Sequence, residues 1–169
     1  MTTRLAVLGD SIAWGQGAAR ERDRLGPRLA DGLTLRGIQV DVRVFAVPGA
    51  RSSGLTTQVR AASAWSQALA VIVIGANDLT HREPVAAAVQ SLADAVRLLR
   101  EAGTEVVVAP APDLSSVPHV PVFLRGAVRA AGESLREKQV VAVLKAGGHV
   151  ADADERAARA FAGDASLFC

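Results

Sequence analysis

Three residues of the sequence have types that suit acyl transfer, and each stands just beyond an apolar run. They are Ser11, Gly49 and Asn77. A serine hydroxyl acts as a nucleophile when a tight turn positions it and a base takes its proton. A glycine lets a backbone amide approach a ligand closely, and an asparagine side chain can donate to a developing oxyanion. Together the three residue types favour acyl-transfer chemistry.

The apolar runs before these residues have the composition of buried strands. In chain order the runs are Leu5–Leu8, Val42–Val47 and Leu69–Ile74. The carboxyl ends of parallel strands meet at one edge of a sheet, and binding sites form at that edge. We therefore expect the serine, the glycine and the asparagine to lie close together.

Each residue also has a purely structural explanation. Ser11 is a common residue type at the N-cap of a helix. Gly49 lies in a Pro-Gly pair, which is frequent in turns, and Asn77 suits a turn or a helix cap. Farther along, Ser52 or Ser53 is expected to cap the next helix. Taken one at a time, the three candidate residues leave both explanations open.

The apolar periodicity alternates between strand and helix along the chain, which predicts an α/β fold with a parallel sheet. The strands are rich in Val, Ile, Leu and Ala, as expected when both faces of a sheet are covered. The predicted strands are Leu5–Leu8, Val40–Val47, Leu69–Ile74, Glu105–Ala109 and a short one at Val150–Ala153. The predicted helices are Ala18–Leu35, Ser52–Ser66, Pro84–Ala102, Val122–Ala146 and Glu155–Phe161.

Length and composition describe one soluble globular domain. The chain has 169 residues, of which 50% are hydrophobic and 21% are charged, and this is enough for one core. No apolar run is long enough to span a bilayer. No signal peptide is visible at the N-terminus, so we expect a cytoplasmic protein.

Charge and cysteine content disfavour several other classes. The net charge is +2, the arginines are mixed with acids and the chain has no Tyr, so nucleic-acid binding is disfavoured. Cys169 is the single cysteine, and it offers neither an internal disulfide nor a zinc framework. No cluster has metal-ligand spacing, and no glycine-rich loop matches a phosphate cradle. We therefore expect neither a metal nor a cofactor.

In combination the motifs are far more specific than each is alone. Gly9-Asp10-Ser11-Ile12 after the first strand, Gly49 after the second and Gly75-Ala76-Asn77-Asp78 after the third resemble the SGNH (GDSL) hydrolase family. The resemblance covers essentially the whole chain, residues 1–169, as a single domain. It implies a flavodoxin-like three-layer α/β/α sandwich with a central parallel sheet of four to five strands.

The resemblance also implies a role for each motif. By it, Ser11 is the nucleophile, and the oxyanion hole consists of the amides of Ser11 and Gly49 with the side chain of Asn77. Asp10 shapes the loop around the serine and is not the acid of the catalytic triad. The implied activity is that of a GDSL esterase or lipase. The implied substrates are small-molecule esters: acetylated sugars, acyl chains or small thioesters.

The sequence departs from the family pattern in its last block. The family places an Asp-x-x-His near the C-terminus, where the His takes the serine proton and the Asp orients the His. Here the nearest candidate is Asp164-Ala165-Ser166-Leu167, with Leu in the place of His. We therefore expect a domain that is truncated at its C-terminus and a chain that turns over little or no substrate.

Three histidines remain as candidate polar groups. His81 follows Asn77 on the same predicted loop and is a substrate contact, a substitute base or an exposed residue. His119 lies in the loop Asp113–Pro121, which we expect to border the pocket and set selectivity, so His119 is a candidate substrate contact. His149 follows a helix end, where a cation complements the helix dipole.

Two main functions stay open at this point. The first is a serine esterase whose C-terminal block is absent from this chain. The second is a catalytically silent binding or regulatory protein on the same scaffold, which the missing His favours. A flavodoxin-like binder of a small ligand is a third, weaker alternative. The sequence predicts neither the oligomeric state nor the particular ester.

Overall fold

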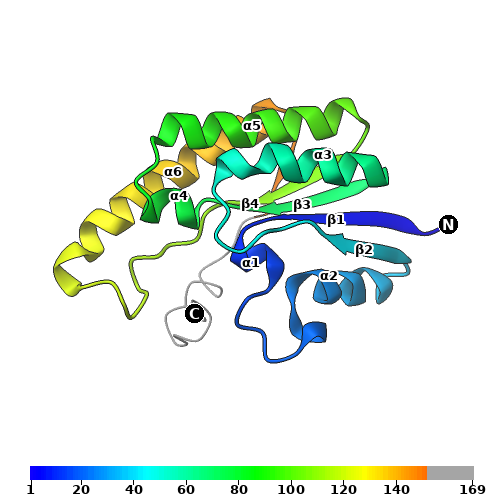
Figure 1. The fold of residues 1–169 in the computed structure, drawn as a ribbon, viewed down its shortest axis with the longest axis horizontal. Coiled ribbons are helices and arrows are strands. Elements are labelled where there is room, and N and C mark those ends of the chain that lie inside the picture. Colours follow the sequence, from blue (N-terminus) through cyan, green and yellow to red (C-terminus); the bar gives the residue numbers. More distant parts are fainter. Residues whose placement is uncertain (152–169) are drawn as a thin grey trace.

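Five parallel strands form one sheet in the order β2-β1-β3-β4-β5. The computed structural model describes residues 1–151, and Figure 1 shows the sheet with helices on both faces. This strand order is that of flavodoxin-like folds, so the structure confirms the predicted α/β sandwich. The strands are β1 (Thr3–Gly9), β2 (Val40–Val44), β3 (Leu69–Val73), β4 (Glu105–Ala109) and β5 (His149–Val150).

The helices alternate with the strands along the chain, as a parallel sheet requires. The α-helices are α1 (Ser11–Trp14), α2 (Leu25–Thr34), α3 (Leu55–Trp65), α4 (Ala76–Thr80), α5 (Val85–Glu101) and α6 (Arg125–Lys145). Short 3-10 helices stand at η1 (Glu21–Asp23), η2 (Ser52–Gly54) and η3 (Val122–Leu124). No helix within residues 1–151 has both the length and the apolar content needed to cross a bilayer.

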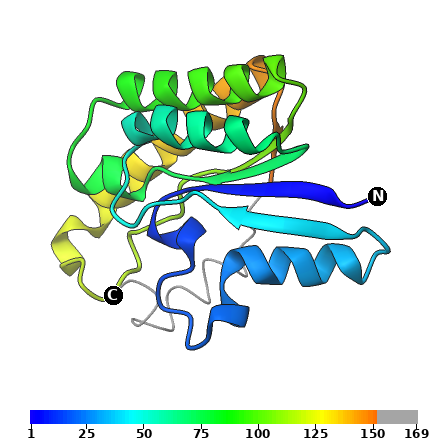
Figure 2. The same cartoon turned by 45° about the vertical axis from the view of Figure 1, so that its right-hand side comes forward.

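The larger core lies between the sheet and helices α3, α5 and α6, which Figure 2 shows together on one side. Helix α5 contributes Leu92, Val96 and Leu99, which recur at helical spacing and are fully buried. They pack in one cluster with Ile72 of β3 and Val108 of β4. Burying a side chain of this size contributes about 1.5–3 kcal/mol, so the packing on this face is a large contribution to stability.

Helices α1 and α2 cover the opposite face of the sheet at β1 and β2 (Figure 1). Val7 and Ala13 are fully buried there. Strand β4 has a different environment on its two faces: Val106 and Val108 are fully buried in the larger core, whereas Val107 is only half-buried. The expected covering of both faces therefore holds for β1 and is incomplete for β4 within the described residues.

The predicted helix Ala18–Leu35 is wrong at its N-terminal end. The structure has the short η1 at Glu21–Asp23, and α2 begins only at Leu25. Pro27 explains the late start, because a proline lacks the backbone N–H and fits only the first turn of a helix. The segment before α2 therefore forms the short η1 and not a first turn of the helix.

Helix α4 (Ala76–Thr80) is absent from the sequence prediction. Gly75 stands before it with a φ of +132°, and a Cβ at Gly75 would lie 2.7 Å from the Cβ of Ala111. Glycine therefore allows the abrupt change from β3 to α4. The last predicted strand begins at His149 instead of Val150, and the predicted helix Glu155–Phe161 lies outside the described residues.

Two buried glutamines hold the carboxyl ends of the strands. Gln139 of α6 donates to the carbonyl of Ile74 at 3.1 Å and accepts from the N–H of Ala111 at 2.8 Å. It thereby joins the segment after β3 to the segment after β4. Gln58 of α3 makes a similar pair of bonds at the end of β1. Each side chain satisfies one backbone donor and one backbone acceptor in the interior.

We predict that Gln139→Ala lowers the free energy of unfolding by about 2–4 kcal/mol, because it removes the partner of two buried backbone groups. Urea denaturation of both proteins measures the change. Lys138→Ala is the matched control, since Lys138 is the exposed neighbour on the same helix, and it should change the value by less than about 0.5 kcal/mol. Equal effects of the two substitutions would contradict the assignment.

Candidate active site

Gly9 shapes the turn between β1 and α1. Its φ is +134°, and a Cβ at this position would stand 1.8 Å from the carbonyl oxygen of Val73, so only glycine fits. The side-chain oxygen of Gln58 accepts from the Gly9 N–H at 2.7 Å, and its side-chain nitrogen donates to the Gly9 carbonyl at 2.9 Å. Both polar groups of the backbone are thus held just before Ser11.

Asp10, and not Ser11, caps helix α1. The Asp10 Oδ1 accepts from the N–H of Ile12 at 2.9 Å, and Asp10 has the extended backbone of an N-cap residue. Ser11 is the first residue of the helix. The interpretation of Ser11 as a cap is therefore wrong. Within the motif, Asp10 orders the turn and Ser11 lines the cavity.

The carboxyl group of Asp10 is buried in an environment that disfavours its charge. The residue is fully buried, and Oδ2 has no hydrogen-bond partner among the described residues. Burial raises the pKa of the Asp10 carboxyl from 3.8 to about 6, and the charge of Asp78 adds a smaller increase. The hydrogen bond from Ile12 lowers the pKa but does not offset the burial.

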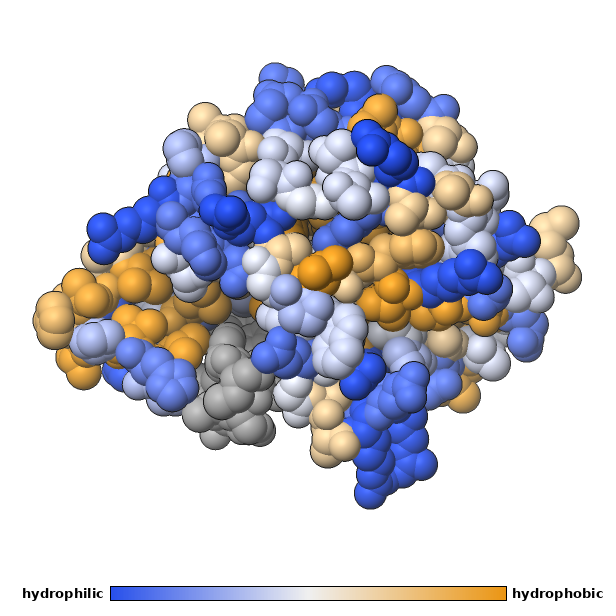
Figure 3. Space-filling view, viewed as in Figure 1, coloured by the Kyte–Doolittle hydropathy of each residue, from blue (hydrophilic) through white to orange (hydrophobic). Residues whose placement is uncertain are grey.

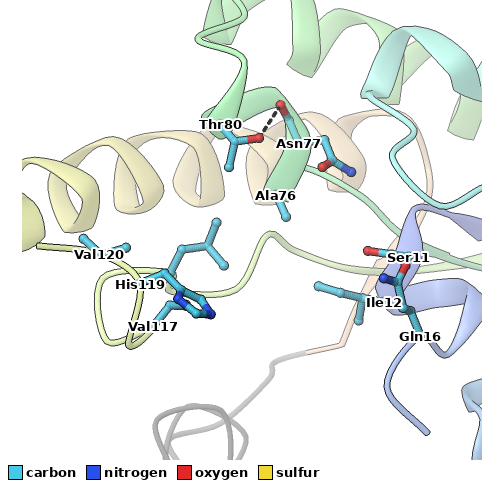
Figure 4. A pocket seen from close by; sticks show the side chains of 10 residues that line it. Ser11, Ile12, Gln16, Ala76, Asn77, Thr80, Val117, His119 and Val120 are labelled. Carbon is cyan, nitrogen blue, oxygen red and sulfur yellow. Dashed lines mark hydrogen bonds between the residues drawn. The ribbon is translucent and has the colours of Figure 1, made fainter. Parts of the chain in front are cut away.

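Ser11 and Asn77 line the same cavity of about 300 Å³ at the carboxyl edge of the sheet (Figure 4). Helix α4 also contributes Thr80, whose hydroxyl donates to the carbonyl of Asn77 at 3.2 Å. The loop between β4 and η3 contributes Val117 and His119, which lie across the cavity from Ser11 in Figure 4. The prediction that Asp113–Pro121 borders the pocket agrees with this lining.

Asn77 lies inside α4, whose N-cap is Gly75, so the helix-cap explanation of Asn77 is wrong. Its side-chain nitrogen donates to the carbonyl of Ala50 at 2.9 Å. This bond connects α4 to the turn that contains Gly49. A side-chain amide has two N–H groups, so one donor of Asn77 remains beyond the bond to Ala50.

Gly49 has a φ of +82° and is exposed. It is not among the described residues that line the Ser11 cavity. Its turn meets the site through the neighbouring Ala50, whose carbonyl accepts from Asn77. The structure therefore brings Ser11 and Asn77 together in one cavity, whereas the amide of Gly49 as an oxyanion donor stays a prediction.

A buried pair fastens the Gly49 turn to α4. The Ser52 hydroxyl donates to the Asp78 Oδ2 at 2.7 Å, and the Ser52 N–H lies 3.0 Å from Oδ1. Both residues are buried. Neither Ser52 nor Ser53 caps the next helix, because the N-cap residues of η2 and α3 are Arg51 and Gly54. Arg51 and Glu83 form an exposed ion pair across the same two segments.

Sequence reasoning missed the Ser52–Asp78 pair. The partners are far apart in the chain, and neither spacing nor composition connects them. The one signal in the sequence is Asp78, the acid beside Asn77 in the third motif. Because α4 is only five residues long, it shows no apolar periodicity from which the burial of Asp78 could be predicted. Gln16 and Leu114 are two further lining residues that no motif marks.

The three histidines occupy different environments. His119 lines the Ser11 cavity. His81 is exposed, is not among the described lining residues, and places Nδ1 2.8 Å from the carbonyl of Asn77. His149 belongs to β5, and its Nε2 lies 3.1 Å from the carboxylate of Glu105 on β4; its role at the helix dipole stays a prediction. The structure thus places one of the two histidines expected to contact substrate, His119, at the cavity, and its contact with substrate stays a prediction.

Residues 1–151 contain no group of three or more His, Cys, Asp or Glu side chains placed to hold a metal ion. Asp164-Ala165-Ser166-Leu167, the counterpart of the family's last block, lies outside the described residues.

The fold and the cavity define an α/β protein that presents a serine and an asparagine at the carboxyl edge of a parallel sheet. The sequence profile of the GDSL-like Lipase/Acylhydrolase family matches residues 7–166. The chain belongs to this family, the SGNH (GDSL) hydrolases, which confirms the resemblance found in the three motifs.

Relatives of known name agree with the family. The chain is 38% identical over 147 residues to the GDSL-like esterase Rv1075c of Mycobacterium tuberculosis (strain ATCC 25618 / H37Rv). That alignment covers 85% of this chain and 47% of the relative, so the chain spans about half the length of the curated relative it matches.

Solved structures share the fold at low identity. TesA is 21% identical, with a TM-score of 0.72 over 88% of this chain and 77% of TesA. The psychrotrophic esterase EstA from Pseudoalteromonas sp., solved as inhibited by monoethylphosphonate, is 15% identical, with a TM-score of 0.68 over 89% of this chain and 76% of EstA. At these identities the likeness establishes the fold alone.

We predict that the stability of this chain depends on pH through Asp10. Folding raises the pKa of its carboxyl from 3.8 to about 6, so between these values the folded chain holds a proton that the unfolded chain has lost. The free energy of unfolding therefore falls as the pH rises through this window, by about 3 kcal/mol in total. Asp10→Asn removes this contribution.

Urea denaturation of the parent and of Asp10→Asn between pH 4 and pH 7 tests the prediction. As the pH rises through the window, the unfolding free energy of the parent should fall relative to that of Asp10→Asn. Asp41→Asn, a change at an exposed carboxyl, is the control. Parallel pH profiles for the parent and Asp10→Asn would disprove the assignment.

A second prediction concerns the Ser52–Asp78 pair. Ser52→Ala removes a buried hydrogen bond and should lower the free energy of unfolding by about 1–3 kcal/mol. Ser53→Ala is the matched control, because Ser53 is the exposed neighbour, and its effect should stay within about 0.5 kcal/mol. Thermal or urea denaturation separates the two outcomes, and similar values would mean that the pair does not hold the turn.

Proposed function

We propose that this chain carries the catalytic serine of an ester hydrolase. The observation that supports the proposal is that Ser11 and Asn77 line one cavity at the carboxyl edge of the sheet. Membership of the GDSL-like lipase/acylhydrolase family agrees with it, as does the esterase name of the Mycobacterium relative. The proposed substrates are small-molecule carboxylic esters.

In the proposed reaction, the Oγ of Ser11 attacks the carbonyl carbon of the ester while its proton passes to a base. The carbonyl oxygen becomes an oxyanion, which the amides of Ser11 and Gly49 and the side chain of Asn77 stabilise. The bond to the alcohol oxygen breaks, and the alcohol leaves with the proton. Water then attacks the acyl-serine, which releases the carboxylic acid and restores the hydroxyl of Ser11.

The base is the part of the mechanism that this sequence does not supply in the family position. Residues 164–167 read Asp-Ala-Ser-Leu, and residues 150–169 contain no His. His119 is the imidazole that lines the cavity, and we assign it to substrate contact. We expect the 169-residue chain to hydrolyse esters slowly and a base supplied in solution to accelerate it.

The same missing His favours a second candidate, a catalytically silent SGNH-like binding or regulatory protein. In that case the cavity holds a ligand, and the hydroxyl of Ser11 takes no part in turnover. The two candidates differ in one measurable respect, which is whether hydrolysis depends on Ser11.

The test is hydrolysis of p-nitrophenyl acetate by the parent, Ser11→Ala and Ser53→Ala, each with and without added imidazole. We expect imidazole to raise the rate of the parent and of Ser53→Ala above that of Ser11→Ala in the same buffer. Asn77→Ala should lower the Ser11-dependent rate by about 100-fold or more, because it removes an oxyanion donor.

A covalent probe gives an independent readout. A p-nitrophenyl alkylphosphonate should form an adduct that mass spectrometry places on Ser11. If the parent and Ser11→Ala hydrolyse at the same rate in every buffer and no adduct forms, the silent scaffold is the correct function.

A further inference from the structure

A second cavity, of about 340 Å³, lies beside the Ser11 cavity, between α4 and the first turns of α6. We call it the α4–α6 groove. Two of its lining residues, Thr80 and Arg82, are polar. The apolar side chains that line it include Leu79, Leu114, Val120, Leu124, Val128 and Ala131. A lining of this kind suits a hydrocarbon ligand and disfavours a sugar, which needs many hydrogen-bond partners.

The groove exists because α6 begins outside the core. Leu124, Ala127, Val128 and Ala131 recur at the spacing of one helix face and form an apolar stripe. The residues that α6 buries come only later, from Gly132 onward. Figure 1 shows the first turns of α6 extending past α4 and the strand ends. The stripe therefore lines the groove instead of packing on the sheet.

The rim of the groove continues this apolar surface into solvent. In η3, the 3-10 helix that precedes α6, Val122 is 76% exposed and Phe123 is 84% exposed. Figure 3 shows hydrophobic residues gathered at this end of the molecule. Exposed apolar side chains that gather on one part of a surface mark interaction or ligand-binding sites.

The groove adjoins the catalytic cavity. Thr80, Leu114 and Val120 line both spaces. A ligand that has its carboxyl carbon at Ser11 can therefore extend past these three residues into the groove. Each of the two volumes lies at the lower end of the range for ligand pockets, and together they accommodate a longer molecule than an acetyl ester.

We propose that the α4–α6 groove holds the acyl chain of the substrate, so that the preferred substrate is an ester of a medium-length, unbranched fatty acid and not an acetyl ester. This inference rests on the proposed function of Ser11. The small side chains of Ala127 and Ala131 leave the room that the chain occupies, and Arg82 adds a polar group to the lining.

The primary test is binding, which needs no turnover. Butanoate, hexanoate, octanoate and decanoate are titrated into the parent and into Ser11→Ala, with calorimetry as the readout. We expect the affinity to rise about three- to fourfold for each added CH₂ while the chain fits. We expect Ser11→Ala to bind decanoate as the parent does, because the groove lies beyond the serine.

Variants that fill the groove provide the matched comparison. Ala131→Trp and, as a second variant, Ala127→Trp should weaken decanoate binding at least tenfold and leave butanoate binding unchanged. Ala130→Trp is the control, because Ala130 is exposed on the same helix and is not among the lining residues. Circular dichroism confirms that each variant is folded. An affinity independent of chain length, or equal effects of the three variants, would overturn the proposal.

Hydrolysis of p-nitrophenyl esters and alkyl esters separates this proposal from the function of Ser11. A Ser11-dependent rate without preference for longer acyl chains would overturn the groove and leave the esterase intact. A preference for decyl acetate over ethyl decanoate, two alkyl esters of equal size, would place the alcohol in the groove and overturn the acyl assignment. Decanoate binding without any Ser11-dependent hydrolysis would support the groove and contradict the esterase.

Discussion

The paired hydrogen bonds between Gln58 and Gly9 are the constraint on which the rest of the site depends. One side chain from α3 holds the N–H and the carbonyl of the residue where β1 ends. A positive φ at that residue and the nearby carbonyl of Val73 allow only glycine. Because this point cannot shift, the next residues enter α1 in one direction, and Ser11 faces the cavity.

Around this fixed turn, the other loops at the sheet edge are fastened to each other and not only to their own strands. Asn77 bonds to Ala50, and Ser52 bonds to Asp78. The turn after β2 and the helix after β3 therefore act as one unit. Such rigidity suits a site whose hydrogen-bond donors must already be in position when an oxyanion develops. Its cost is visible in Asp10, a buried acid whose second oxygen has no hydrogen-bond partner within residues 1–151.

The α4–α6 groove arises because helix α6 extends beyond the ends of the strands. A parallel sheet closes its core where its helices and strands have matching lengths. Here α6 (Arg125–Lys145) begins seven residues before its first buried residue, Gly132. Helix α4 (Ala76–Thr80) is only five residues long. The mismatch leaves an apolar groove next to the serine. The family match covers residues 7–166, and this local mismatch is the feature on which the proposed acyl site rests.

The sequence by itself determined the α/β alternation and the meeting of Ser11 with Asn77. Apolar periodicity is a local property of each element, and the ends of parallel strands share an edge wherever the strands lie. Only the tertiary structure decided that Asp10 caps α1, that Ser52 meets Asp78, that His119 and not His81 reaches the cavity, and that α6 overhangs the core. The cap by Asp10 is a local bond at a helix too short to show a period, and the other outcomes depend on how segments far apart in the chain pack, so no spacing in the sequence encodes them.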